Sequence, residues 1–267
     1  MARYVLLQTS LDPLPIKRLA RAFVASGARV SLDAPTVARY AFGVLLDDLS
    51  ATAASSLASA LDAEGIAVDA CAQSELPMLP RARVLHRADL SADGLLYHTS
   101  QDRTRLVPWG MMRIISMGSI RRRPRATLRL HLPDVDELVE TLDVEDPQKH
   151  EDLVLELLCD GDTPRLRIIA DEFLYTCLGE RMRSRARENF VLLAHEILER
   201  CDVMPNRGAA RFHLGHPEWF TYPGWSAFDE ETRWLMWKIR WSAERGARGD
   251  DPPPAAATGT VRRPKAR

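Results

Sequence analysis

The fold is decided by the stretch RLVPWGMMRIISMG at residues 105–118, where two strand-forming runs flank a turn. Similar short runs lie on both sides of it, separated by turn signals such as Asp93-Gly94 and Asp160-Gly161-Asp162. These runs cover residues 83–86, 95–98, 126–132, 153–159 and 165–169. A helical stripe then follows, formed by Phe190, Leu193, Ala194, Ile197 and Cys201. The order predicts short antiparallel strands closed by one helix.

Residues 1–76 alternate between strand-forming runs and helical stripes. A first helix is expected from Pro13 to Ser26, because Gly27 enters the left-handed cap conformation without steric cost. A second helix begins after Ser50, whose hydroxyl can accept a backbone N–H, and it closes at Gly65. Strands are expected at residues 3–9, 29–32, 41–47 and 66–70. The resulting order is β-α-β-β-α-β, the split βαβ plan.

The chain is expected to contain two modules, an extension and a tail. Pro77 and Pro80 mark a linker between the modules, because proline cannot donate to a strand ladder. An aromatic-rich extension with a helix follows the second module, and a tail rich in Pro, Ala and Arg is expected to be disordered. The predicted domains are residues 1–76, 82–202, 203–246 and 247–267.

Composition narrows the class of protein. The chain has 267 residues with 46% apolar content, enough for two packed modules, and a net charge of −1 argues against a protein built wholly for nucleic acid. No run of about 18 apolar residues predicts a transmembrane helix, and the first apolar run is too short for a signal peptide. We therefore expect a cytoplasmic protein. Buried free thiols are expected at Cys71, Cys159, Cys177 and Cys201.

The element order of residues 1–76 resembles the ferredoxin-like α/β domains of the ACT type. Such domains bind amino acids in regulatory proteins, so the resemblance implies a small α/β sandwich and raises the alternative of a metabolite sensor. ACT-type ligand loops tend to carry a glycine after the first strand. The corresponding loop here reads Ser10-Leu11-Asp12-Pro13, without a glycine.

Residues 82–202 resemble the pleckstrin-homology-like (PH-like) domains of bacteria. The resemblance rests on Asp93-Gly94-Leu95, on Val107-Pro108-Trp109, and on Ile114-Ile115 with the following Gly118. It implies a small antiparallel barrel closed by a C-terminal helix. Together the two modules predict an α+β fold.

Two charge blocks of opposite sign stand out. Arg121, Arg122, Arg123 and Arg125 form the densest basic cluster, either as a solvated strand connection or as an anion-binding site for nucleic acid or lipid phosphate. The acidic stretch 134–152 predicts an inserted helix, because its apolar side chains share one face. That face is formed by Val135, Leu138, Val139 and Leu142. A second arginine series comprises Arg181, Arg183, Arg185 and Arg187, for which a surface ion-pair network is expected.

No local sequence motif identifies a catalysed reaction. The chain has no P-loop, no G-x-G-x-x-G, no H-E-x-x-H and no serine nucleophile elbow. His213, His216 and Glu218 offer metal-ligand atoms, but Pro217 interrupts the helix that such a motif would need. We therefore predict no catalytic residues, no metal site and no cofactor, and an enzyme is the less favoured class.

Trp234, Trp237 and Trp241 lie at i, i+3 and i+7 of a helix expected from Asp229 to Arg245. One interpretation is that this stripe docks on another part of the chain. The second is an interface for a protein partner, since tryptophan is a common anchor residue, and the third is a helix on a membrane surface.

The function expected from these features is that of a non-catalytic intracellular regulatory or scaffold protein acting through protein–protein interaction. Two compact modules without a catalytic motif motivate it. The alternatives are a small-metabolite sensor acting through residues 1–76, and an anionic lipid or nucleic-acid binder acting through the arginine cluster. No feature identifies the partner protein.

Overall fold

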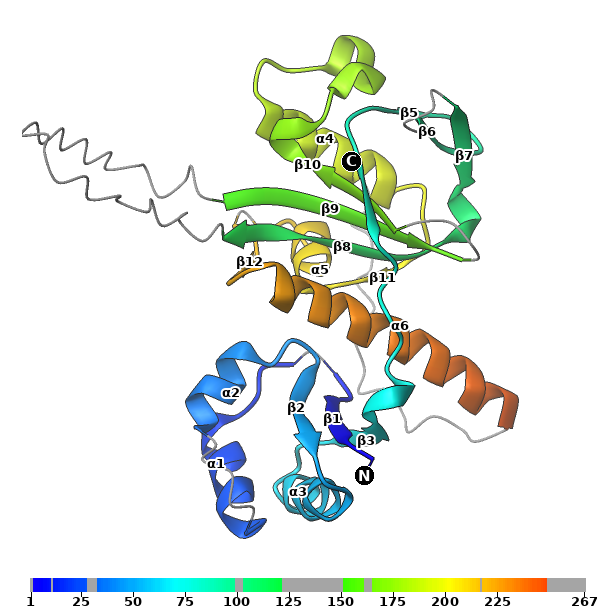
Figure 1. Cartoon of the computed structure of the whole chain (residues 1–267). Coiled ribbons are helices and arrows are strands. Elements are labelled where there is room, and N and C mark those ends of the chain that lie inside the picture. The colour runs from blue at the N-terminus through cyan, green and yellow to red at the C-terminus, as the bar shows by residue number, and fades with distance from the viewer. Residues whose placement is uncertain are drawn as a thin grey trace, which may run out of the picture.

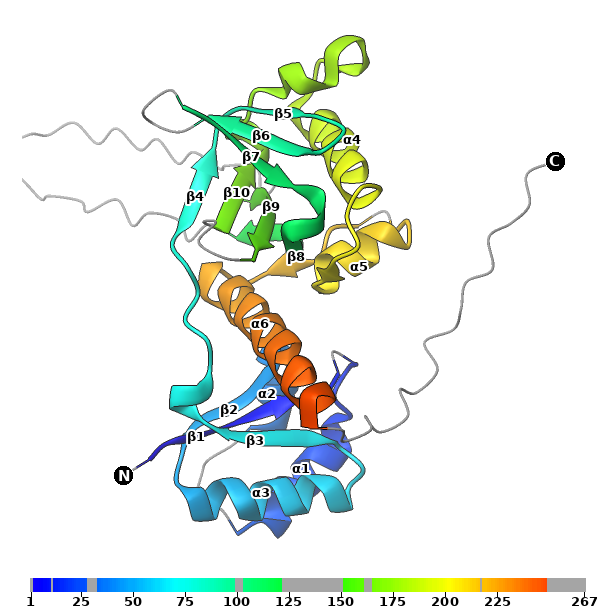
Figure 2. The same ribbon diagram turned by 90° about the vertical axis from the view of Figure 1, so that its right-hand side faces the viewer.

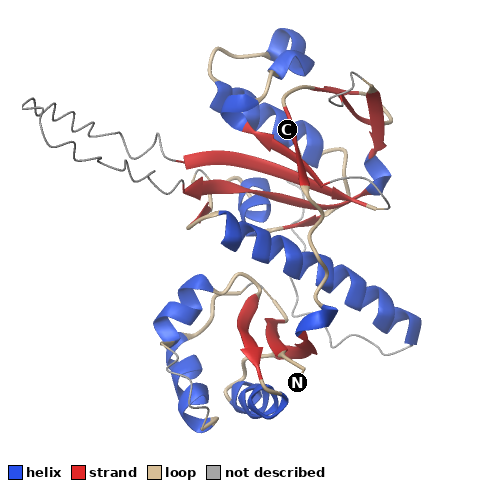
Figure 3. Cartoon of the chain, viewed as in Figure 1, coloured by secondary structure: helices blue, strands red, loops and turns tan. Residues whose placement is uncertain are grey.

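The structure is a computed structural model of the whole chain, and it describes most of the sequence. The described residues are 2–10, 12–27, 33–98, 103–121, 151–160, 165–216 and 218–248, with the backbone alone described for 241–248. Helices and strands are mixed along the chain (Figure 3), and the strands among these described residues form three sheets. The expected α+β character is confirmed at this level.

As far as its described residues show, the N-terminal module is a three-stranded antiparallel sheet with helices on one face (Figure 1). The sheet order is β2-β1-β3, so the first strand is central. Its side chains alternate between two faces: Leu6 packs with the helices, whereas Val5 and Leu7 face away from them. The elements are β1 (Tyr4–Gln8), α1 (Ile16–Ala25), α2 (Ala34–Tyr40), β2 (Val44–Leu49), α3 (Ala51–Ala63) and β3 (Val68–Ala72).

The predicted helices and three of the four predicted strands of this module are present. Ser50 caps α3 by accepting the backbone N–H of Ala53 at 3.2 Å, as its position indicated. The strand expected at residues 29–32 lies outside the described residues. Helix α2 was not predicted; Asp33 caps it by accepting from the N–H of Thr36, and Pro35 lies in its first turn.

The described part of the second module contains two sheets and two α-helices. The larger sheet has the order β11-β8-β9-β10-β4, with β12 also paired to β8, and the smaller has the order β5-β6-β7. The strands are β4 (Ala82–Leu85), β5 (Ala88–Leu90), β6 (Gly94–His98), β7 (Thr104–Pro108), β8 (Met112–Arg121), β9 (Glu151–Cys159), β10 (Arg165–Ile169), β11 (Met204–Pro205) and β12 (Thr221–Tyr222). The helices are α4 (Ala186–Leu198) and α5 (Arg207–His213).

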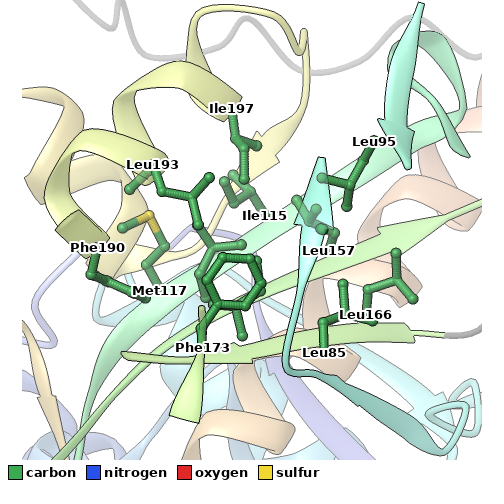
Figure 4. Packing of buried hydrophobic residues seen from close by; sticks show 14 of the residues in the cluster. Leu85, Leu95, Ile115, Met117, Leu157, Leu166, Phe173, Phe190, Leu193 and Ile197 are labelled. Atoms are coloured by element: carbon green, nitrogen blue, oxygen red, sulfur yellow. The ribbon is translucent and has the colours of Figure 1, made fainter. Parts of the chain in front are cut away.

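The core of this module lies between α4 and the two sheets (Figure 4). Phe190, Leu193 and Ile197 of α4 pack on Ile115, Met117 and Leu157 of the larger sheet. The smaller sheet contributes Leu95, Tyr97 and Val107 to the same core. The helical stripe predicted from Phe190 onward is therefore the buried face of α4.

The strands of the second module do not form the closed barrel that the sequence suggested, as far as the described residues show. Pro108 ends β7 without an N–H to donate, and a 3₁₀ turn, η2 (Trp109–Met111), separates β7 from β8, so the two sheets stay apart. Three pairings, β4–β10, β11–β8 and β12–β8, are parallel rather than antiparallel. The predicted strand at 126–132 and the predicted helix within 134–152 lie outside the described residues.

Helix α6 (Trp225–Arg248) is a layer between the two modules (Figure 2). It begins four residues before the predicted start at Asp229. The sheet of the N-terminal module packs on one side of it, and the larger sheet of the second module packs on the other. The predicted extension is thus shared: β11 and β12 join the larger sheet, while α6 joins both modules.

Candidate functional site

The candidate functional site is the module junction, which we define as α6, its contacts with residues 5–9 and 41–47, and Arg207. Its apolar part combines side chains from three layers. Val5 and Leu7 come from β1, Ile114 and Leu158 come from the larger sheet, and all four are at most 5% exposed. Trp234, Leu235 and Trp237 of α6 fill the space between them.

Trp234 anchors α6 to the N-terminal module. Its indole Nε1–H donates to the backbone carbonyl of Gln8 at 2.7 Å, and its ring lies against Gly43. A β-carbon at Gly43 would lie 2.3 Å from Cγ of Trp234, and the φ of +91° is also one that favours glycine. The turn before β2 is therefore shaped to receive this ring. Lys238, one turn later, donates to the carbonyl of Thr9.

Arg207 reaches across the same junction from the start of α5. Its guanidinium donates to the carbonyl of Ala41 at 2.9 Å and lies 5.4 Å from the ring centroid of Phe42. The Gln8 side-chain oxygen is 3.5 Å from the same guanidinium nitrogen and also accepts the N–H of Gly43. These contacts hold the 41–43 turn from the side of the second module.

A network of buried, hydrogen-bonded polar side chains fixes the backbone at Arg207. Asn206 donates to the hydroxyl of Tyr222 at 2.8 Å, and that hydroxyl donates to Glu231 at 2.6 Å. The other carboxylate oxygen of Glu231 accepts the backbone N–H of Arg207 at 2.8 Å. The side chain of Asn206 also accepts the backbone N–H of Met117 and donates to the carbonyl of Met117, and these two hydrogen bonds join the network to β8. Burial raises the pKa of Glu231 and of Tyr222.

A second ionic cluster ties the other end of α6 to the larger sheet. Glu156 of β9 is fully buried and contacts Arg165 at 2.8 Å and also Arg167. Arg165 in turn contacts Asp229 of α6 at 2.6 Å, and Arg167 stacks over the ring of Trp225 at 3.9 Å. Burial raises the pKa of Glu156, while the two arginines oppose that shift.

The predicted site residues fall in different places. Trp234 and Trp237 are 2% and 5% exposed inside the junction, as the internal-docking interpretation describes; the side chain of Trp241 lies outside the described residues. Arg121 ends β8, is 68% exposed and lies 3.8 Å from Glu151. Arg122, Arg123 and Arg125 lie outside the described residues.

The second arginine series surrounds the start of α4. Arg181 is paired with Glu196, and Arg185 lies 4.0 Å from Glu188. Arg183 and Glu188 line a shallow hollow of about 260 Å³ together with Val191 and Leu192. The expected surface ion pairs are thus present for two of the four arginines.

All four cysteines are free thiols, as predicted, but only Cys71 is buried, whereas Cys159, Cys177 and Cys201 are half-buried. Burial raises the pKa of Cys71, Cys177 and Cys201 to about 11 and that of Cys159 to about 12. These raised pKa values favour the protonated thiol near neutral pH. Among the residues described, no group of three or more His, Cys, Asp or Glu side chains is placed to hold a metal ion.

Sequence reasoning missed most of the junction. Gln8, Asn206, Arg207 and Glu231 carry no local signature, because their partners lie far away along the chain. One signal was present: the run Val5-Leu6-Leu7 is apolar on both faces of its strand, which is typical of a strand covered on two sides.

Comparisons with known proteins found no match among family models, curated proteins or solved structures. Within the described part of the chain, no helix is both long and apolar enough to cross a bilayer.

Proposed function

We propose that this chain is a non-catalytic regulatory or scaffold protein that acts by binding another protein. The module junction is the observation that carries the proposal. The two modules are held in one orientation by the buried tryptophans, by the contacts of Arg207 and by the network of buried polar side chains next to Arg207. A pair of modules held in this way can present surfaces of both to a single partner.

We further propose the ferredoxin-like plan for the N-terminal module and the PH-like plan for the second. In the split βαβ plan the first strand lies between the third and fourth strands and is antiparallel to both. The antiparallel order β2-β1-β3 is consistent with that arrangement. In the second module, β4 to β10 precede the covering helix α4, which is the element order of a PH-like domain.

The test is affinity capture with the full chain as bait, followed by reconstitution from purified components. We expect a recovered protein to rebind the purified chain at a fixed stoichiometry. Hydrogen–deuterium exchange should then show protection on both modules, because the partner would contact surfaces held together by the junction.

The role of the junction is tested with the Gly43→Ala variant, whose added β-carbon disturbs the junction without touching the outer surfaces. We expect it to bind the same partner several-fold more weakly while circular dichroism shows both modules folded. The proposal is contradicted if no recovered protein rebinds the purified chain. Protection limited to one module, with unchanged binding by the variant, would contradict the role of the junction.

A further inference from the structure

Three sulfur-bearing side chains meet at one end of the larger sheet, beneath the end of α4. Met112 begins β8 and Cys159 ends β9, and the two residues are direct partners in the antiparallel ladder (Figure 1). The β-carbons of direct partners lie about 4.5–5.5 Å apart. Cys201 follows α4 and donates its S–H to the thioether of Met112, with the two sulfur atoms 3.4 Å apart.

A β-bulge turns Met112 toward the two cysteines. The register of β8 on β9 shifts between Met112 and Ile114, so that Met112 packs in the core under α4 while Arg113 is exposed. Cys159 and Cys201 pack against the same core. All three side chains therefore lie on the α4 side of the larger sheet, whereas Ile114 faces the module junction on the other side.

The exposure of these side chains gives an ion a path to them. Met112 is 1% exposed, whereas Cys159 and Cys201 are half-buried. An ion from solvent can thus reach the thiols and meet the thioether behind them. Cys201 also contributes to the raised pKa of Cys159, which agrees with the proximity of the two thiols.

The sulfur atoms suit a soft metal ion. With metal–sulfur bonds of about 2.3 Å, one ion can bind two sulfur atoms that lie up to about 4.6 Å apart. The 3.4 Å between Cys201 and Met112 is within that limit. Thiolate and thioether ligands together select Cu(I). Structural zinc sites instead take four Cys, His or acidic ligands, and the described residues offer no group of even three such side chains.

We propose that Cys159, Cys201 and Met112 form a binding site for one Cu(I) ion, held by two thiolates and one thioether. Each thiol loses its proton as its bond to copper forms, so one Cu(I) replaces two protons and no electron is transferred. The ligands come from three separate elements, which is why no local spacing in the sequence predicted a metal site. The site lies within the second module and does not depend on the proposed protein partner.

Competition for Cu(I) with the chelator bicinchoninate tests the site, using the reduced full chain under nitrogen. We expect the wild type to take about one Cu(I) per chain. Changes next to a metal ligand already weaken binding by about 10–100-fold, so loss of a thiolate in Cys159→Ser or Cys201→Ser should weaken it by at least about 100-fold. Cys177→Ser is the matched control, because it removes a half-buried thiol of η5 (Tyr175–Arg181) and should bind as the wild type does.

Met112→Leu is the second test, and it remains informative if a serine variant does not fold. It keeps both thiols and nearly the volume of the buried side chain, so circular dichroism should show a folded chain. We expect about tenfold weaker binding of Cu(I). X-ray absorption at the copper edge should show only sulfur ligands in the wild type, with one fewer in this variant.

The proposal is overturned if the wild type does not compete for Cu(I), or if nitrogen or oxygen ligands surround the bound copper. Equal losses in Cys177→Ser and Cys201→Ser would also overturn it, because any thiol would then serve. Wild-type affinity in Met112→Leu would contradict the three-sulfur site, because the two thiols alone would account for the binding.

Discussion

At Gly43 the backbone takes a φ of +91°, and the ring of Trp234 lies where a β-carbon would be. Two separate costs meet at this residue, because the backbone conformation and the close approach both exclude a side chain. We predict that Gly43→Ala lowers the free energy of unfolding by about 3 kcal/mol. Urea denaturation followed by circular dichroism measures it.

Gly27 provides the matched control for that substitution. Its φ is +61°, but a β-carbon there would meet nothing within 4 Å. Gly27→Ala therefore carries the backbone cost alone, which we expect to be about 1 kcal/mol. Equal effects of the two substitutions would show that the contact with Trp234 contributes nothing.

At the scale of elements, β9 and β10 are joined by a buried ion pair as well as by their ladder. Glu156 lies between Arg165 and Arg167, and all three are at most 15% exposed. We predict that Glu156→Gln lowers the free energy of unfolding by about 3–5 kcal/mol, because two buried guanidinium groups lose their counter-charge. Urea denaturation of the full chain gives the value.

Glu64→Gln is the comparison for this ion pair, because Glu64 makes a bidentate contact with Arg21 on the surface of the N-terminal module. Solvent screens that pair, so its loss should have a much smaller effect than Glu156→Gln. If both substitutions destabilise the chain equally, burial does not set the strength of these ion pairs.

How far the sequence predicted the structure depends on the range of the interactions. Strands such as β8 and the capped helix α3 follow from period and local chemistry, and both were predicted. The parallel pairing of β4 with β10 was not, because nothing in either run specifies a partner about 80 residues away. For the stripe of Trp234 and Trp237, the spacing predicted one apolar face but left open what covers it. Only the packing of α6 on both sheets decided that.

At the scale of the whole molecule, the two modules are linked by residues 76–81 and, independently, by the module junction. We predict that a protease site placed at Met78, which is 90% exposed, can be cut without separating the halves. The buried apolar contacts of Val5 and Leu7 with α6 should keep the fragments together at micromolar concentration. Gel filtration after cleavage measures co-elution.

The Gly43→Ala variant sharpens this cleavage experiment. It keeps the linker and the cut site but weakens the contact with Trp234, so its fragments should separate at a higher protein concentration than the wild-type fragments do. Separation of the wild-type fragments at every concentration would contradict the prediction.

The position of α6 in the chain also has a consequence for biosynthesis. The ribosome makes the N-terminal sheet and the larger sheet of the second module before it makes Trp234 and Trp237. Helix α6 therefore cannot cover Val5, Leu7, Ile114 and Leu158 until late in translation. During that interval the nascent chain exposes an apolar surface that favours chaperone binding or self-association. A message truncated before codon 225 would release a polypeptide with both faces bare, and such a product should be cleared rather than accumulate.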